Sequence, residues 1–210
     1  FYSLSALATI IFCERGLPFL YQGQEIGMSN RRWQYDEFND LETINQYQIA
    51  VKAGMSKEQA LEIAGHHSRD NARTPMQWSS EENAGFSKGK PWMPVNENYK
   101  VVNVAEEEKE YGSILNFYKR LIAFYKSEEY NEILTYGDFR PMYKKEDHIF
   151  AYSRSYGCQK LVLICNFSSK EKDIELSEDY ENVIFVNYEQ TTVIGNTLKM
   201  KPYECVIYEM

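Results

Sequence analysis

Charged side chains that could do chemistry gather in two short polar stretches of the chain. The first is NDLETIN at residues 39–45, and the second is HHSRDNAR at residues 66–73. In the second stretch Asp70 stands between Arg69 and Arg73, and neighbouring cations lower the pKa of a carboxyl group. A low pKa suits an ion pair and disfavours a general acid, so we expect Asp70 to be structural.

Several other polar or aromatic groups have both a functional and a structural interpretation. Glu25 ends the strand-like run PFLYQGQEI and could face an active site, but a structural carboxylate is the favoured interpretation. Trp78 and Trp92 could stack on sugars, although tryptophans in such loops more often anchor packing. His66 and His67 are adjacent, so they cannot both face one ion as ligands one helical turn apart would. We therefore infer no metal site and no cofactor.

The elements that position these groups follow from hydrophobic spacing and capping signals. Residues 1–14 carry apolar side chains on nearly every side, which is typical of a helix buried all round. Ser56 and Gln59 form a capping box, and residues 66–99 are rich in turn formers and predict a long irregular loop. We expect one strand at residues 18–26 and further helices at residues 40–53, 56–65 and 111–126.

Beyond residue 127 the pattern changes to short strands separated by turn signals, which predicts a small antiparallel β-sandwich. The four cysteines lie mostly in apolar runs without a C-x-x-C pair, and we interpret them as reduced core residues. The expected strands are HIFAYSRS, KLVLICNF, KDIEL, NVIFVN, TLKMK and ECVIYEM.

Composition excludes several classes of protein. Of the 210 residues 43% are hydrophobic and 26% are charged, which is the composition of a globular protein. The net charge of -8 argues against a nucleic-acid partner, because such binding needs concentrated positive charge. The apolar run at residues 1–13 is too short to span a bilayer and lacks the features of a signal peptide. We therefore expect a cytoplasmic protein with no membrane partner.

Four segments together resemble one enzyme family. They are GLPFLYQGQEIGMSN from Gly16, NDLETIN, HHSRDNARTPMQW and ENAGFSKGKPWMPVNENYK. These resemble the end of the catalytic barrel in α-glucosidases of the α-amylase superfamily. The group that is most similar holds oligo-1,6-glucosidases, with dextran glucosidases, trehalose-6-phosphate hydrolases and sucrose isomerases. The resemblance implies an α/β plus all-β fold, the C-terminal end of a (β/α)8 TIM barrel followed by an antiparallel β-sandwich called domain C.

The same resemblance implies retaining hydrolysis of an α-glucosidic bond. That reaction needs a nucleophilic carboxylate and a second carboxyl group that acts as acid and then as base. In the family these carboxylates precede the segments found here, and the chain contains no N-H-D or R-x-D motif. We therefore expect no catalytic residue in this chain and expect it to be inactive alone.

Two residues are expected to bind substrate because they match family motifs. Arg69, in R-D-N, matches the arginine that holds the hydroxyls of the terminal sugar, and the alternative is an arginine that only pins its loop. Glu42 matches a glutamate near the next subsite, and the alternative is a carboxylate in a first helical turn. Asn39 departs from the commoner R-D-I-E-T, which weakens the match at Glu42.

The sequence thus predicts a C-terminal segment of an intracellular α-glucosidase that acts on oligosaccharides in the complete enzyme. Residues 1–127 would be the barrel segment, with a substrate loop at 27–110, and residues 128–210 domain C. The alternative is a self-standing carbohydrate-binding or structural β-sandwich module. Substrate choice, α-1,6 or α-1,4 linkage, and hydrolysis or isomerisation stay open. Without the barrel that would cover residues 1–14, we expect the isolated chain to self-associate.

Overall fold

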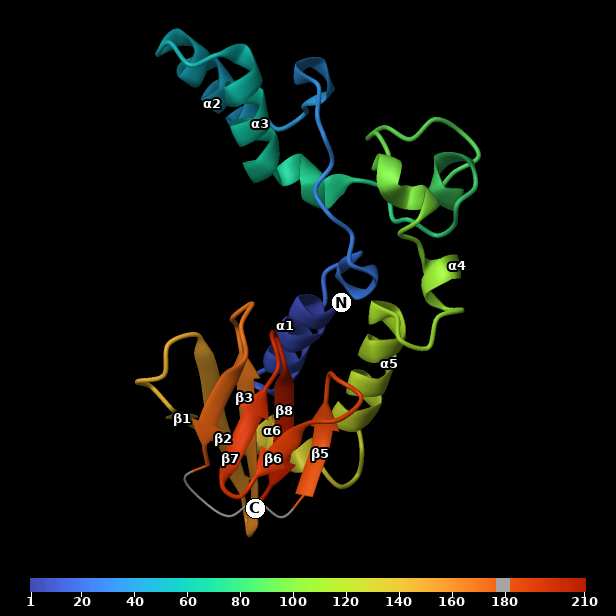
Figure 1. The fold of residues 1–210 in the computed structure, drawn as a ribbon. Coiled ribbons are helices and arrows are strands. Elements are labelled where there is room, and N and C mark those ends of the chain that lie inside the picture. The colour runs from blue at the N-terminus through green and yellow to red at the C-terminus, as the bar shows by residue number, and fades with distance from the viewer. Residues whose placement is uncertain (177–181) are drawn as a thin grey trace. The chain divides into compact units, whose positions relative to one another are not determined.

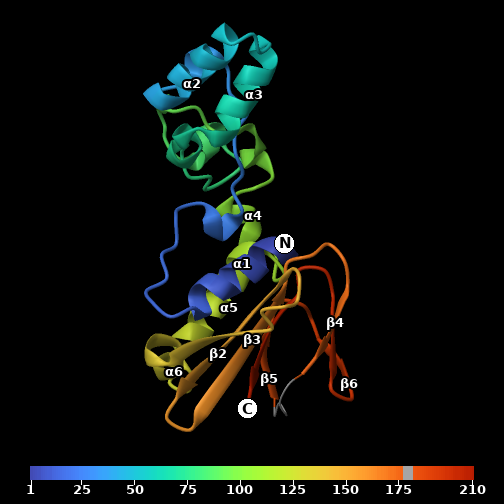
Figure 2. The same ribbon diagram turned by 90° about the vertical axis from the view of Figure 1, so that its left-hand side faces the viewer.

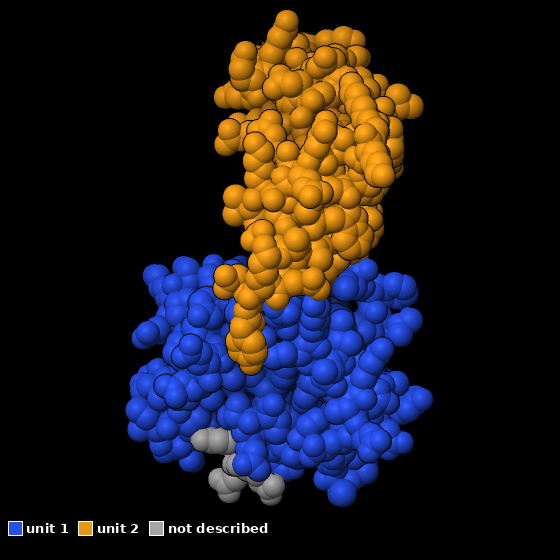
Figure 3. Space-filling view, turned by 90° about the vertical axis from the view of Figure 1, so that its right-hand side faces the viewer, with its two compact units in different colours: residues 1–20, 112–210 blue, residues 21–111 orange. Residues whose placement is uncertain are grey.

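The computed structural model describes residues 1–176 and 182–210, which divide into two compact units. Unit 1 comprises Phe1–Leu20 and Gly112–Met210, and unit 2 comprises Tyr21–Tyr111 (Figure 3). The predicted boundary at 127/128 stays a prediction for the intact protein. Within this structure the division falls elsewhere, because the first helix and the helix before residue 127 both pack on the sheet of unit 1.

Unit 1 has three layers, a group of helices, a five-stranded sheet and a three-stranded sheet (Figures 1 and 2). Both sheets are antiparallel throughout, which confirms the predicted sandwich. The larger sheet has the order β1-β2-β3-β8-β5 and the smaller β4-β7-β6. The strands are β1 Asp138–Met142, β2 Ile149–Tyr156, β3 Gln159–Asn166, β4 Lys172–Glu175, β5 Asn182–Val186, β6 Thr192–Ile194, β7 Thr197–Met200 and β8 Cys205–Glu209.

The central strand β3 shows why the sequence builds three layers. Successive side chains of a strand point to opposite faces, and β3 is apolar at every position from Leu161 to Cys165. Leu161 and Leu163 pack into the helix-facing core, while Val162 and Ile164 pack into the core between the sheets. A strand buried on both faces reads as a continuous apolar run.

Helix α1 (Tyr2–Cys13) and helix α5 (Ile114–Tyr125) pack side by side on the larger sheet, with α6 (Asn131–Tyr136) beside them (Figure 2). One face of α1 is buried, but Tyr2, Leu4 and Leu7 are 40–45% exposed. Leu4 and Leu7 thus present an apolar face to solvent, while the ring of Tyr2 stacks on that of Tyr188. Burial of residues 1–14 on all sides stays a prediction for the intact protein, in which the expected barrel would cover this face.

One buried arginine joins α1 to the sheet. Arg154 on β2 is 1% exposed, and its Nη1 donates to the carbonyl of Cys13 over 2.7 Å. Its Nε and Nη2 donate to the carbonyl of Gly137, at the end of α6. A cation at helix C-termini satisfies carbonyls that lack helical partners.

Two other predictions are wrong. The segment 18–26 forms no strand, because a parallel strand needs neighbouring strands and none of the described strands flanks it. Cys165 and Cys205 are not reduced but form a disulfide, since the strand order places them directly opposite each other on β3 and β8. Cys13 and Cys158 are free, and burial raises the pKa of the Cys13 thiol to about 12.

Unit 2 is built from short helices and turns around a small core of Trp33, Phe38 and Met93. The predicted helices at 40–53 and 56–65 are confirmed, and Ser56 accepts the amide of Gln59 as expected of its cap. The helices are α2 Leu41–Lys52, α3 Lys57–His67 and α4 Val104–Glu107, with 3-10 turns at Gln24–Ile26, Tyr35–Glu37, Arg69–Arg73, Glu82–Gly85 and Glu97–Lys100. In the described ranges no helix is long and apolar enough to cross a membrane.

Candidate functional site

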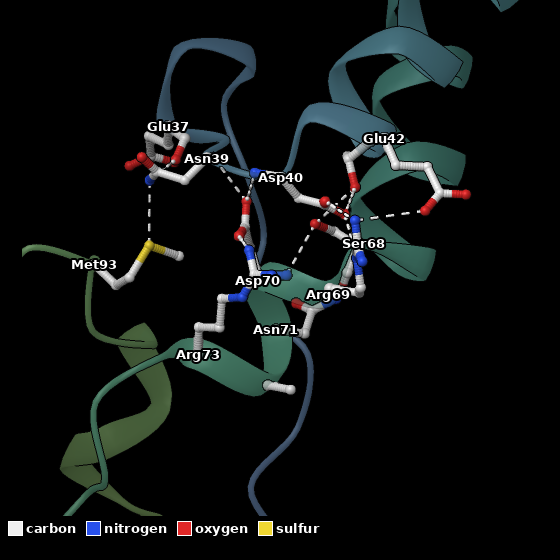
Figure 4. A network of polar contacts seen from close by, with 12 residues as sticks. Glu37, Asn39, Asp40, Glu42, Ser68, Arg69, Asp70, Asn71, Arg73 and Met93 are labelled. Carbon is white, nitrogen blue, oxygen red and sulfur yellow. Dashed lines mark hydrogen bonds and ion pairs between the residues drawn. The ribbon is translucent and has the colours of Figure 1, made fainter.

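The motif SRDNAR at residues 68–73 folds as a 3-10 turn directly after α3. Ser68 caps this turn, because its hydroxyl accepts the amide of Asp70. The side chains of Arg69 and Asp70 then bond to residues 39–40, as Figure 4 shows, and that of Asn71 bonds to Trp33. The motif therefore holds together two stretches that are distant in sequence.

Asp70 is structural, as predicted, and is fully buried. Its Oδ2 accepts the backbone amides of Asn39 and Asp40 at 2.8 and 2.9 Å, and its Oδ1 accepts Nη1 of Arg73 at 2.9 Å. Both carboxylate oxygens accept hydrogen bonds from the protein, and the full burial of the side chain keeps it from a ligand in solvent. Its bonds fix the chain where α2 begins.

Arg69 forms a fork with the buried carboxylate of Asp40. Nη2 lies 2.5 Å from Oδ1 and Nε 3.2 Å from Oδ2. The hydrogen bonds from Arg69 hold the pKa of Asp40 well below its usual range. The Arg69 side chain is nevertheless 62% exposed, and its Nη1 has no partner among the described residues. One edge of the guanidinium is thus fixed by protein and the other faces solvent.

Two hydroxyl groups form a chain of hydrogen bonds that ends at the carboxylate of Asp40. Thr43 Oγ1 lies 2.8 Å from Asp40 Oδ2 and 3.0 Å from Ser68 Oγ. A hydroxyl has one proton to donate, so when Thr43 donates to Asp40 the proton between the two hydroxyls belongs to Ser68. This chain of bonds determines the position of Asp40 and, through it, the position of Arg69.

Glu42 lies in the first turn of α2 and is brought next to Arg69. Its Oε2 is 3.5 Å from Nη2 of Arg69, and its Oε1 accepts Nε2 of Gln46 at 3.3 Å. The Glu42 side chain is 63% exposed. The two residues expected to bind substrate are therefore neighbours at one solvent-facing corner of unit 2, though 27 residues separate them in sequence.

Further residues of the site carry no sequence signal for their role. Asn71 Oδ1 accepts Nε1 of Trp33 at 2.8 Å, and its Nδ2 donates to the carbonyl of Gly65. Arg31 makes two hydrogen bonds to Glu37, which lower the pKa of that carboxyl group. The pairing of Trp33 with Asn71 joins residues 38 apart in sequence, and no spacing rule predicts it.

The remaining candidates lie outside this corner. Glu25 sits in a short 3-10 turn, and its Oε2 is buried without a hydrogen-bond partner among the described residues. Trp78 and Trp92 are 51% and 73% exposed, so the prediction that they anchor packing is wrong, because the loop leaves both indoles outside the small core. His66 and His67 touch edge to face, and the described residues hold no group of three or more potential ligands placed for a metal ion.

Comparison with known proteins identifies the family. The family description "Alpha amylase, catalytic domain" matches residues 2–137, and "Alpha-amylase SusG C-terminal domain" matches residues 149–207. This chain belongs to the alpha-amylase family. It joins the end of that family's barrel domain to an antiparallel C-terminal domain, which confirms the fold class expected from sequence.

Members of the family resemble the chain over nearly all of its length. It is 39% identical to an oligo-1,6-glucosidase of Bacillus cereus over 99% of the chain. Its fold matches the trehalose-6-phosphate hydrolase of Bacillus licheniformis with a TM-score of 0.90 at 36% identity. It matches the isomaltulose synthase of Protaminobacter rubrum with a TM-score of 0.88 at 34% identity. Each of these matches includes 99% of this chain but only 38% of the relative's own length.

Proposed function

We propose that this chain is the C-terminal portion of a retaining α-glucosidase that hydrolyses α-1,6 or α-1,4 bonds of short oligosaccharides. The names of its relatives support this choice over a self-standing binding module. We also propose that the two carboxyl groups that attack and protonate the glycosidic bond lie outside these 210 residues. The chain alone should therefore leave p-nitrophenyl α-glucoside and isomaltose intact, and turnover abolished by Asp70→Asn would contradict this.

Within that enzyme we propose that Arg69 binds hydroxyl groups of the substrate's terminal sugar. The observation that carries this role is the fork to Asp40, which fixes the guanidinium while leaving Nη1 exposed. A planar group held along one edge presents its remaining N–H donors in a fixed direction. Binding of a sugar then costs little side-chain entropy, because the arginine is already ordered.

Glu42 is proposed as the acceptor beside this donor. Its carboxylate is exposed and lies within 3.5 Å of the guanidinium. A sugar carries hydroxyl groups that both donate and accept, so an adjacent arginine and glutamate can bind two neighbouring hydroxyls. The pair fits a neutral sugar better than an anion, since Glu42 would repel a second negative charge.

The test is a set of kinetic and melting measurements on the complete enzyme. Arg69→Ala should lower kcat/KM for isomaltose about 10- to 150-fold, because charge-assisted hydrogen bonds are lost. Arg69→Lys should recover part of the loss, since one ammonium group cannot replace a planar fork. Arg32→Ala is the matched control, because Arg32 is an exposed arginine of the same unit. If Arg69→Ala keeps kcat/KM and only its melting temperature falls, Arg69 is a loop clamp and the proposal fails.

A further inference from the structure

The segment ENAGFSKGKPWMP at residues 81–94 contributes to a second hollow in unit 2. The hollow has a volume of about 510 Å³, which lies within the range of small-molecule sites. Trp92 lines it with an indole that is 73% exposed, and Asn39 and Asp36 line it from the segment before α2. None of the substrate-binding groups proposed above lies in this hollow.

Polar groups without partners surround the indole. The carboxylates of Asp36 and Glu82 and the hydroxyl of Tyr99 have no hydrogen bond or ion pair within the described part of the chain. Asn39 donates through Nδ2 to the Met93 sulfur and the Glu37 carbonyl, and these bonds leave its Oδ1 without a partner there. The hollow therefore combines one aromatic face with several free acceptors and a free hydroxyl group.

Asn83, which also lines the hollow, lies in a turn whose backbone is strained. Asn83, Ala84 and Gly85 all have left-handed φ values, of 55, 58 and 65°. The carbonyl of Ala84 accepts the amides of Trp78 and Ser79, which holds the turn in place. Non-glycine residues in this region are costly and cluster at binding sites. Asn83 Nδ2 donates to two carbonyls of the same loop, so its Oδ1 is both oriented and free.

We propose that this hollow is a second oligosaccharide-binding site, with Trp92 as the stacking platform. An exposed indole stacks on the apolar face of a sugar ring, and the surrounding acceptors suit hydroxyl groups. A nucleotide or other anion fits poorly, because the carboxylates of Asp36, Glu37 and Glu82 line the hollow together with a single lysine, Lys90. A purely apolar ligand also fits poorly, because it would displace water from the carboxylates without offering them hydrogen bonds.

The site is distinct from the corner formed by Arg69 and Glu42. In Figure 4, Asn39 and Met93 lie on one side of the buried Asp70, and Arg69 and Glu42 lie on the other. Sugar binding at Trp92 therefore does not depend on Arg69. The two proposals can fail independently, because one is measured by turnover of the complete enzyme and the other by binding to this chain.

The test uses the chain itself and the indole N–H resonances of its tryptophans in NMR spectra. Titration with isomaltotriose should shift the Trp92 resonance with saturation in the millimolar range, while the buried Trp33 stays unchanged. Trp92→Ala should weaken sugar binding measured by calorimetry at least about tenfold. Trp78→Ala is the matched control and should bind as the wild type does, because Trp78 is exposed but does not line the hollow.

A second variant separates loss of the platform from loss of the fold. Asn39→Arg places a longer side chain in the hollow and should reduce binding while the spectra of α2 and α3 stay native. Arg69→Ala should leave the Trp92 shift unchanged. The proposal is overturned if Trp92→Ala binds the sugar as the wild type does. It is also overturned if the Trp92 resonance does not shift at about 50 mM sugar, or if calcium without sugar produces the same shift.

Discussion

The two units of this chain are stabilised by different kinds of interaction. Unit 1 is held by two hydrophobic clusters on the two faces of its larger sheet. Unit 2 has a small hydrophobic cluster around Trp33, Phe38 and Met93 and depends on side chains that bond to distant backbone. Apolar packing tolerates changes of similar volume, whereas a buried carboxylate tolerates almost none. The unit that carries the proposed binding sites should therefore be the more sensitive to single polar substitutions.

The largest effect is expected from Asp70→Ala, which tests that difference directly. The substitution leaves two backbone amides and the guanidinium of Arg73 without their acceptor. A buried donor left without its acceptor costs about 1–3 kcal/mol of folding free energy, and here two backbone amides are affected, while Arg73 is partly exposed and can turn to solvent. Hydrogen exchange should show loss of protection in residues 21–111 and native protection in residues 112–210. The control is Asp173→Ala in unit 1, where an exposed ion pair to Lys199 is worth at most about 1 kcal/mol.

If both units lose protection together in Asp70→Ala, the proposed difference is wrong and the chain unfolds as one cooperative body. If neither unit loses protection, the polar network does not stabilise unit 2.

Arg154 is the polar exception in unit 1 and should give the next largest effect. Arg154→Met retains apolar volume on β2 but leaves the carbonyls of Cys13 and Gly137 without a donor. Each lost partner costs about 1–3 kcal/mol, offset in part because a desolvated charge is removed. Thermal unfolding should place the net loss at about 1–3 kcal/mol. A more stable Arg154→Met would show that unit 1 needs apolar packing alone.

Sequence reasoning succeeded where the signal was periodic. Helix α5 was predictable because Ile114, Phe117 and Leu121 recur on one face, and β3 because its apolar run is unbroken. The short edge strands β1 and β6 were missed, since β1 contains Pro141 and β6 has three residues.

The pairings that define the candidate site were beyond such reasoning. Arg69 and Asp40 are 29 residues apart, and only the folded turn after α3 reveals that they meet. The disulfide between Cys165 and Cys205 depends on strand order, which short apolar segments do not specify. Whether Trp92 is buried or exposed depends on whether another segment of the folded chain packs on it, and no residue pattern contains that information.

The polar network of unit 2 should also respond to pH, with a smaller effect than either substitution above. Arg69 holds the pKa of Asp40 below its usual range, so the charged carboxylate stabilises the fold above about pH 4. This contribution is lost as the pH falls through the folded-state pKa, because the carboxyl group then takes up a proton. Asp40→Asn removes the charge but keeps the shape. Its deficit in melting temperature should be several degrees at pH 6 and should shrink toward pH 2.

Arg69 titrates far above this range and stays charged throughout, so it adds no pH dependence of its own here. A deficit that is constant from pH 6 to pH 2 would show that Asp40 acts through its size and not through its charge.

The smallest effect on stability, but a distinct effect on assembly, is expected from Leu7→Glu on α1. Leu7 is 45% exposed beside Tyr2 and Leu4, so a glutamate there remains solvated and costs within about 0.5 kcal/mol. The same change places a charge in an exposed apolar face, and such faces drive association. Light scattering over a dilution series should find the wild-type chain self-associated and Leu7→Glu shifted toward monomer. Ile194→Glu is the matched control, because it makes the same change from an apolar to a charged side chain at a site 60% exposed on β6. If Ile194→Glu dissociates the chain equally well, association depends on net charge and not on the α1 face. A wild-type chain that is already monomeric would show that this face does not mediate self-association.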